Sequence, residues 1–293
     1  MQRQPQAQTD RAIGVMDSGL GGLNVLAEIH RQAQHQNLIY YADTAHCPYG
    51  NKSVDFIRKR VHDITTELIE QGVSVMVLAC NTASAAALDW LRTQVDIPVV
   101  GMEPAIKPAA AATKNGRVGV LATGVTLQAD RFASLLERFA SGIEVISEPA
   151  QEFVDLVEAG RLSGPDVERI VRDKLRPLIE ARVDTLVLGC THYPFLTPLF
   201  ERLLPPNVTI IDPGPQVAAQ ALRVHPTQGS LGDETGQGQV TILSSESSHY
   251  ATEAARRLCP ELFASPAFDP SQQDETARKP IETTSKIAEG NEP

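Results

Sequence analysis

Residues Val75–Ser84 read VMVLACNTAS, an apolar run that ends in a small residue, a cysteine and a group of polar residues. Residues Thr185–Pro194 read TLVLGCTHYP and repeat this order, so that Cys80 aligns with Cys190. A short run that is apolar throughout is typical of a strand buried on both faces of a parallel sheet. Each segment therefore predicts a buried strand with a cysteine directly after its end.

A second pair of segments aligns at nearly the same offset. Ala12–Gly19 reads AIGVMDSG and matches Arg117–Gly124, RVGVLATG, with Gly19 on Gly124. Two pairs at similar offsets indicate two related halves, each carrying a cysteine after a buried strand. Chance matching between short apolar runs is the alternative.

Further apolar runs rich in β-branched residues predict the other strands of the chain. With the runs above, the predicted strands are Ile13–Met16, Leu38–Tyr41, Val73–Leu78, Pro98–Gly101, Val118–Leu121, Glu144–Ile146, Thr185–Leu188 and Val208–Ile211.

The stretches between these runs have the apolar spacing of helices. Asp55–Glu70 carries apolar residues at intervals close to 3.6 and is followed by Gly72, a suitable helix C-cap. Val125–Phe139 and Gly164–Ala181 show a similar pattern. Strands that alternate with helices predict an α/β protein with parallel sheets and crossover helices.

The chain length of 293 residues suggests two domains. We expect a first α/β domain from residues 12–102 plus about 211–264, and a second from residues 103–210. Residues 1–11 are expected to be a flexible N-terminus and Gly232–Gln239 a polar surface loop. Residues 265–293 hold six acids, three bases and four prolines with few large apolar residues, which predicts a disordered tail.

The composition excludes several classes of protein. With 42% hydrophobic and 21% charged residues the chain is ordinary for a folded protein, and its net charge of −10 has the wrong sign for binding nucleic acid. No apolar run approaches the roughly 20 residues that span a bilayer, and the N-terminus is too polar for a signal peptide. We therefore expect a cytoplasmic protein with no nucleic-acid or membrane partner.

The cysteines, Cys47, Cys80, Cys190 and Cys259, are too sparse for a disulfide framework and are expected to be free thiols. No metal site is expected, because the closely paired cysteines of structural zinc sites are missing from the sequence. The GLGGLN segment has Asn24 where a dinucleotide-binding fingerprint needs its third glycine.

Polar residues follow several predicted strands, where ligands bind in open α/β sheets. These clusters are Asp17-Ser18-Gly19, Asp43-Thr44 with Pro48-Tyr49-Gly50, Cys80-Asn81-Thr82 and Cys190-Thr191-His192.

Cys80 and Cys190 occupy equivalent places, so two halves that face each other would bring both thiols to one cleft. Inverting a stereocentre by proton transfer needs a base on one face of the carbon and an acid on the other. A thiol with an ordinary pKa of about 8.5 can serve as either. The alternative for each cysteine is a buried structural thiol.

The neighbouring polar residues each have two interpretations. His192 could support a thiolate at Cys190, or be an ordinary buried or surface histidine. Asp17 and Asp43 could orient a base, bind a substrate ammonium or cap a helix, and capping also suits Ser18. Asn81 and Thr82 could be helix caps or donors to a substrate carboxylate.

Together the motifs IGVMDSGLGGLNVL, YYADTAHCPYGNKS, VLACNTASA, VVGMEPA, LVLGCTHYPFL and IDPG resemble the glutamate racemases of the aspartate/glutamate racemase superfamily. The resemblance runs from about Ile13 to about Leu222. It implies two α/β domains with pseudo-twofold symmetry, an active site in the cleft between them, no cofactor, a homodimer, and racemisation of glutamate for peptidoglycan synthesis.

The resemblance also implies roles for individual residues. Cys80 would be the base that acts on D-glutamate, supported by Asp17, and Cys190 the base that acts on L-glutamate, supported by His192 and Glu158. Substrate contacts would come from Asp17, Ser18, Tyr49, Gly50, Asn81, Thr82, Thr191 and His192, with Asp43 as a further acid. Asp155 departs from the family, which commonly has a proline there, and His46 and Cys47 lie where the family varies.

Three other functions remain open from the residues alone. An aspartate racemase would share the two-thiol site. A cysteine hydrolase would use Cys190 as nucleophile and His192 as base, and would leave Cys80 without a role. A non-catalytic binding module could keep the shape of the site.

Overall fold

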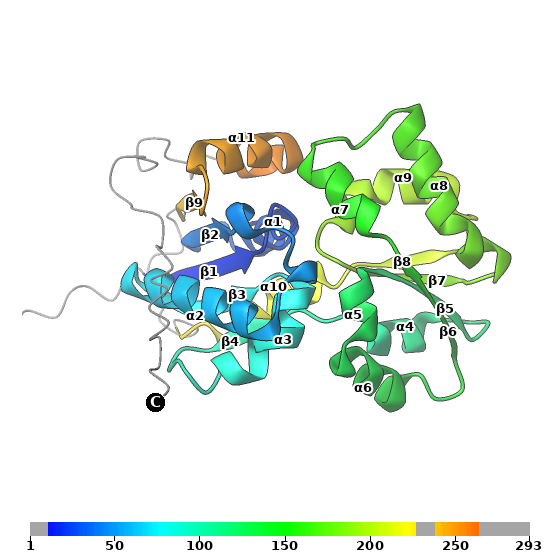
Figure 1. Ribbon diagram of the computed structural model, residues 1–293, viewed down its shortest axis with the longest axis horizontal. Coiled ribbons are helices and arrows are strands. Elements are labelled where there is room, and N and C mark those ends of the chain that lie inside the picture. Colours follow the sequence, from blue (N-terminus) through cyan, green and yellow to red (C-terminus); the bar gives the residue numbers. More distant parts are fainter. Residues whose placement is uncertain (1–10, 227–237, 264–293) are drawn as a thin grey trace, which may run out of the picture.

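The computed structural model describes residues 11–226 and 238–263, which form two parallel β-sheets flanked by helices (Figure 1). The predicted tail, residues 265–293, lies outside the described residues. So do residues 1–10 of the predicted N-terminus and all but the last two residues of the predicted loop Gly232–Gln239. The predicted fold class, α/β with two similar parallel-sheet halves, is confirmed.

The strands of the first sheet lie in the order β4-β3-β1-β2-β9, and those of the second in the order β6-β5-β7-β8. All pairs of neighbouring strands are parallel. The strands are β1 Ala12–Asp17, β2 Leu38–Ala42, β3 Val73–Leu78, β4 Val99–Gly101, β5 Arg117–Ala122, β6 Glu144–Pro149, β7 Thr185–Gly189, β8 Thr209–Ile211 and β9 Val240–Ser244.

The two sheets repeat one topology. Written from its other edge, the second sheet reads β8-β7-β5-β6, which matches the β4-β3-β1-β2 part of the first strand by strand. β1 and β5, which carry the AIGVMDSG and RVGVLATG segments, hold the same place in their sheets, as do β3 and β7 with their cysteines. This agreement supports the related halves inferred from the sequence over chance matching.

The helices are α1 Leu23–Gln32, α2 Val54–Glu70, α3 Asn81–Leu91, α4 Ile106–Ala112, α5 Gly124–Gln128, α6 Asp130–Phe139, α7 Gln151–Glu158, α8 Pro165–Glu180, α9 Thr197–Leu203, α10 Gly214–Val224 and α11 Ser248–Leu258. Short 3-10 helices lie at Thr44–His46, Tyr49–Asn51, Tyr193–Leu196 and Pro260–Phe263. No helix within the two described ranges is long and apolar enough to cross a membrane.

Side chains that alternate along a strand bury opposite faces of each sheet. On β1, Ile13 and Val15 belong to a cluster that also holds residues of α1 and α10, whereas Met16 belongs to one with residues of α2 and α3. The first of these clusters continues into α7, α8 and α9 of the second half. One apolar core therefore joins the two sheets on that side.

The predicted strands are present, with ends shifted by up to three residues. Gly72 follows α2 with a φ of 91°, the left-handed conformation expected of a glycine after a helix. Two features differ from the prediction. β9 was not predicted, and the predicted helix Val125–Phe139 is divided into α5 and α6, because the backbone at Ala129 is extended.

β9 adds an edge strand that pairs with β2, and its Ile242 is fully buried (0% exposed). We expect Ile242→Ala to lower the free energy of unfolding by about 2–5 kcal/mol, since the truncation leaves a cavity in the core. Thr241→Ala, on the partly exposed face of the same strand, should change it by about 0.5 kcal/mol or less. Urea unfolding followed by circular dichroism measures both. Equal losses would mean that β9 does not anchor the core.

Candidate active site

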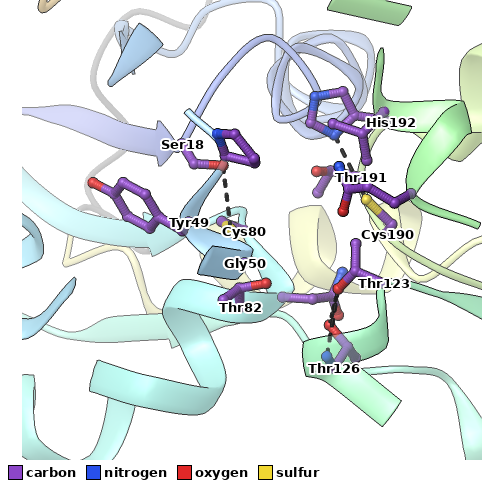
Figure 2. A pocket seen from close by; sticks show the side chains of 14 residues that line it. Ser18, Tyr49, Gly50, Cys80, Thr82, Thr123, Thr126, Cys190, Thr191 and His192 are labelled. Carbon is purple, nitrogen blue, oxygen red and sulfur yellow. Dashed lines mark hydrogen bonds between the residues drawn. The ribbon is translucent and has the colours of Figure 1, made fainter. Parts of the chain in front are cut away.

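The carboxyl ends of the two sheets share one pocket, built from the segments that follow β1, β2, β3, β5, β6 and β7 (Figure 2). Its free space is only about 20 Å³, room for little more than one water molecule. The predicted residues that line it are Ser18, Tyr49, Gly50, Cys80, Asn81, Thr82, Cys190, Thr191 and His192. The predicted residues Asp17, Asp43 and Glu158 do not line the pocket and lie behind its walls.

Cys80 lies at the N-terminus of α3, where its sulfur accepts a hydrogen bond from the Ala83 N–H at 3.4 Å. The Ser18 hydroxyl lies 3.6 Å from the same sulfur. Burial and then the nearby Asp17 carboxylate raise the pKa of Cys80 to about 12. In the closed pocket this thiol therefore holds its proton at neutral pH.

Asp17 lies behind Ser18 and is fully buried. Its Oδ1 accepts hydrogen bonds from the Ser18 hydroxyl and the Gly19 N–H, and its Oδ2 accepts one from Thr191 Oγ1 at 2.9 Å. Burial raises the pKa of the Asp17 carboxyl. Asp17 thus reaches Cys80 through Ser18 and also connects the first half to the second.

Cys190 has different neighbours. Its sulfur lies 3.6 Å from His192 Nδ1, and His192 Nε2 lies 2.6 Å from Glu158 Oε1 at the end of α7. Burial opposes the charged form of His192, but its hydrogen bonds to Cys190 and Glu158 prevail and raise its pKa well above the ordinary value. The contact with His192 likewise outweighs burial and lowers the pKa of Glu158. The contacts with Cys190 and Glu158 therefore favour the protonated form of His192 beside the Cys190 sulfur.

The departure at Asp155 does not disturb this arrangement. Asp155 is exposed on α7, one turn before Glu158, and Glu158 still reaches His192. Cys47 lies behind the site with its sulfur 3.9 Å from Glu158 Oε1.

The GLGG loop after β1 explains how the halves approach so closely. A Cβ added to Gly21 would collide with the His192 ring and would lie 2.5 Å from Thr191 Oγ1. A Cβ added to Gly19 would collide with the Glu158 carboxylate. The glycines that failed to match a dinucleotide fingerprint therefore make room for the residues around Cys190.

Asp43 differs from its predicted role as a further acid at the site. Its buried carboxylate pairs with Arg60, at 2.6 and 3.0 Å, and accepts hydrogen bonds from Tyr49 Oη and from the His46 ring. Although burial alone would raise it, the Arg60 guanidinium holds the pKa of Asp43 below its usual value. Because Arg60 is itself buried, the carboxylate turns toward it and fixes Tyr49 at the pocket wall.

Asn81 lies in the pocket wall with neither its amide oxygen nor its amide nitrogen hydrogen-bonded within the described residues. The residue is only 5% exposed. Buried polar groups without partners are rare and need an explanation. At this position the amide is available to a bound ligand, as donor and as acceptor.

Thr123, Thr126, Gln151 and Val154 also line the pocket and were not predicted from the sequence, whereas Pro48 belongs to one of the predicted clusters. Thr123 could have been predicted, because the alignment that pairs Gly19 with Gly124 also pairs the predicted site residue Ser18 with Thr123. Its side chain caps α5 and lies 3.0 Å from the Thr126 hydroxyl. Gln151 and Val154 had no such signal, since they lie on α7 after an edge strand.

Within residues 11–226 and 238–263, no group of three or more His, Cys, Asp or Glu side chains is arranged to hold a metal ion. The polar groups that face the pocket are thiols, hydroxyls, amides and one imidazole. Such groups suit proton transfer and the binding of a small polar ligand.

Comparisons with known proteins agree on one family. The model of the Asp/Glu/Hydantoin racemase family matches residues 13–222. A glutamate racemase of Pseudomonas putida is 52% identical over 258 residues, covering 88% of this chain and 96% of the relative.

Two solved structures are similar in fold. Escherichia coli glutamate racemase in complex with L-glutamate and the activator UDP-MurNAc-ala has a TM-score of 0.74 at 33% identity, covering 88% of this chain and 97% of that one. Francisella tularensis glutamate racemase in complex with D-glutamate has a TM-score of 0.70 at 28% identity, covering 86% and 94%.

The pairing of His192 with Glu158 can be tested by titration. We expect Glu158→Gln to lower the pKa of the His192 ring, because the buried imidazolium loses its carboxylate partner. NMR of the labelled histidine ring against pH measures the shift. The control is Glu152→Gln, which removes a carboxylate from the exposed first turn of the same helix. A His192 pKa that does not fall in Glu158→Gln would show that Glu158 does not hold the charge.

Proposed function

This chain belongs to the Asp/Glu/Hydantoin racemase family and is therefore an isomerase, and we propose that its substrate is glutamate, which it interconverts between the L and D forms. The observation that carries the proposal is the place of Cys80 and Cys190. They follow equivalent strands, β3 and β7, of two sheets with the same topology, and both line one pocket. The Pseudomonas relative at 52% identity supports glutamate as the substrate.

The mechanism we propose moves one proton on each face of the Cα atom. For L-glutamate, the Cys190 thiolate takes the Cα proton, and the protonated Cys80 thiol gives its own proton to the opposite face. The product is D-glutamate, with Cys190 now protonated and Cys80 ionised. The reverse reaction uses the same groups in exchanged roles.

The surroundings of each thiol fit these roles. The His192 ring, whose protonated form is favoured, lies 3.6 Å from the Cys190 sulfur, where a positive charge would face the proposed thiolate. Cys80 is kept as a thiol by burial and by Asp17, and its ionised form receives the Ala83 N–H at the positive end of α3.

The difficult step is the formation of a carbanion beside a carboxylate. Donors fixed in advance, in a pocket that excludes water, stabilise the charge that develops. The unpartnered Asn81 amide and the hydroxyls of Thr82, Thr123 and Thr191 border the pocket and are suitable donors to the α-carboxylate. Because two thiols carry the proton transfers, the proposed reaction needs no cofactor.

Glutamate cannot enter a space of about 20 Å³, so we infer that the two halves separate to admit it. The hydrogen bonds that cross between them at the site include those from Thr191 Oγ1 to Asp17 and from the Leu20 N–H to Glu158. Opening would break these bonds, and closing on the substrate would form them again and expel water.

The cellular role follows from the family resemblance. We infer that the protein supplies D-glutamate for peptidoglycan synthesis, works in the cytoplasm, and forms a homodimer. The predicted domains, residues 12–102 with about 211–264 and residues 103–210, would be the two bodies that move.

A second function deserves a test because Cys190, His192 and Glu158 also form the arrangement of a cysteine hydrolase, with sulfur to ring at 3.6 Å and ring to carboxylate at 2.6 Å. That reaction would use one thiol only. Cys80 is the residue that separates the two functions.

Proton NMR in D2O tests substrate and mechanism together. We expect L- and D-glutamate to lose their Cα proton signal without added cofactor, and aspartate to react far more slowly. Cys80→Ala and Cys190→Ala should each reduce racemisation by at least about 100-fold, the contribution of one acid or base. Residual exchange should remain with L-glutamate in Cys80→Ala and with D-glutamate in Cys190→Ala.

Other outcomes of the same experiment are decisive. Absence of exchange with both enantiomers would overturn the racemase mechanism. Full activity in Cys80→Ala would favour a mechanism that uses Cys190 alone, and glutamate binding without exchange would favour a binding module.

The close approach of the halves gives a second prediction, with a control supplied by the repeat. Gly19→Ala should lower racemisation on the order of 100-fold, because the added methyl displaces Glu158 and with it His192. Gly124 aligns with Gly19, and a Cβ there would meet nothing within 4 Å, so Gly124→Ala should leave activity within about twofold. Steady-state rates measured by circular dichroism compare the two. Similar rates for both variants would contradict the packing role of Gly19.

A further inference from the structure

Two side chains in the pocket wall have buried polar atoms without a hydrogen-bond partner among the described residues, Asn81 and Gln151. Asn81 directly follows Cys80, and its unpartnered amide is explained by the proposed contact with the α-carboxylate of the substrate. Gln151 has no role in the mechanism above, although its amide nitrogen Nε2 is shielded from solvent and lacks an acceptor. A donor buried in this way is costly unless a ligand supplies the acceptor.

Gln151 lies at the outer end of the pocket. Gly50, also in the pocket wall, is its neighbour, since a Cβ built on Gly50 would lie 4.0 Å from Gln151 Oε1. Gln151 and Gly50 are both partly exposed, whereas Cys80 and Cys190 are only 7% and 9% exposed. The pocket therefore has an inner end at the thiols and an outer end at Gly50 and Gln151.

The reaction fixes which end of the substrate reaches each place. The Cα atom must lie between the two thiols, at the inner end, so the group that extends outward is the end of the side chain. We propose that Gln151 donates an amide N–H to this distal carboxylate and thereby selects an amino acid with the length and charge of glutamate. The proposal rests on the proposed function and deepens it.

The position of Gln151 is rigid enough for such selection. It is the first residue of α7, which packs into the core through Phe153, Leu156 and Val157 and ends at Glu158. The same helix thus carries the proposed contact to the substrate side chain and the carboxylate that holds His192. A substrate shorter by one methylene group would leave the Gln151 donor unpaired, which a site of this kind penalises.

Gln151→Glu provides the sharpest test, because it replaces a donor by an acceptor of nearly the same size. It should lower kcat/KM for L-glutamate by about tenfold to 100-fold, mainly through KM, since the contact is made equally in the ground and transition states. L-glutamine ends in an amide that can donate to the new carboxylate. The ratio of kcat/KM for glutamine to that for glutamate should therefore rise at least tenfold.

Two further variants keep the test decisive. Gln128→Glu adds the same charge on an exposed position of α5 and should leave both substrates unaffected. Gln151→Met keeps the length of the side chain but has no donor, and should raise KM for glutamate about tenfold with little change in kcat. It also decides the matter if the buried charge of Gln151→Glu prevents folding.

The proposal and the racemase function fail in different ways. If the wild-type protein exchanges the Cα proton of glutamate but Gln151→Glu leaves the preference between glutamate and glutamine unchanged, the role of Gln151 is overturned and the racemase function stands. The same holds if Gln151→Met leaves KM unchanged. Absence of exchange in the wild-type protein overturns both.

Discussion

The Glu158 carboxylate is the point on which the site depends. One oxygen accepts the Leu20 N–H of the first half at 2.8 Å and contacts His192 of the second half at 2.6 Å. Glycines at positions 19 and 21 leave the space for this approach, because a side chain there would collide with Glu158 or with His192. The contact between the halves and the support of His192 beside Cys190 therefore share one carboxylate oxygen.

The repeat makes the two thiols equivalent in position, while their neighbours make them unlike. Cys80 has a hydroxyl, a helix N-terminus and the buried Asp17 around it, so it retains its proton. Cys190 has a charged imidazole. The proposed racemisation by two bases requires that one thiol be protonated while the other is ionised, and the two sets of neighbours differ although the sheets repeat.

Much of the fold could be predicted, since buried parallel strands are apolar over their whole length and stand out between amphipathic helices. The alignment of VMVLACNTAS with TLVLGCTHYP predicted two related halves, and the two sheets share one strand order. The prediction missed β9. This short strand pairs with β2 and forms the edge of the first sheet. It also joined α5 to α6, because the apolar spacing continues through Ala129 although the backbone does not remain helical.

The residue pattern alone indicates where chemistry could occur, because the polar residues that follow buried parallel strands must gather at one edge of a sheet. It identified Ser18, Cys80, Asn81, Cys190 and His192 in this way. Which of these candidates face the pocket depends on the three-dimensional packing. In the folded chain, Asp43 pairs with Arg60 and does not face the pocket. Glu158 contacts Leu20, which is 138 residues away in the sequence, and Gln151 lies at the outer end of the pocket. Such contacts depend on tertiary packing, within the first half for Asp43 and between the halves for Glu158, and no local pattern of residues records that packing.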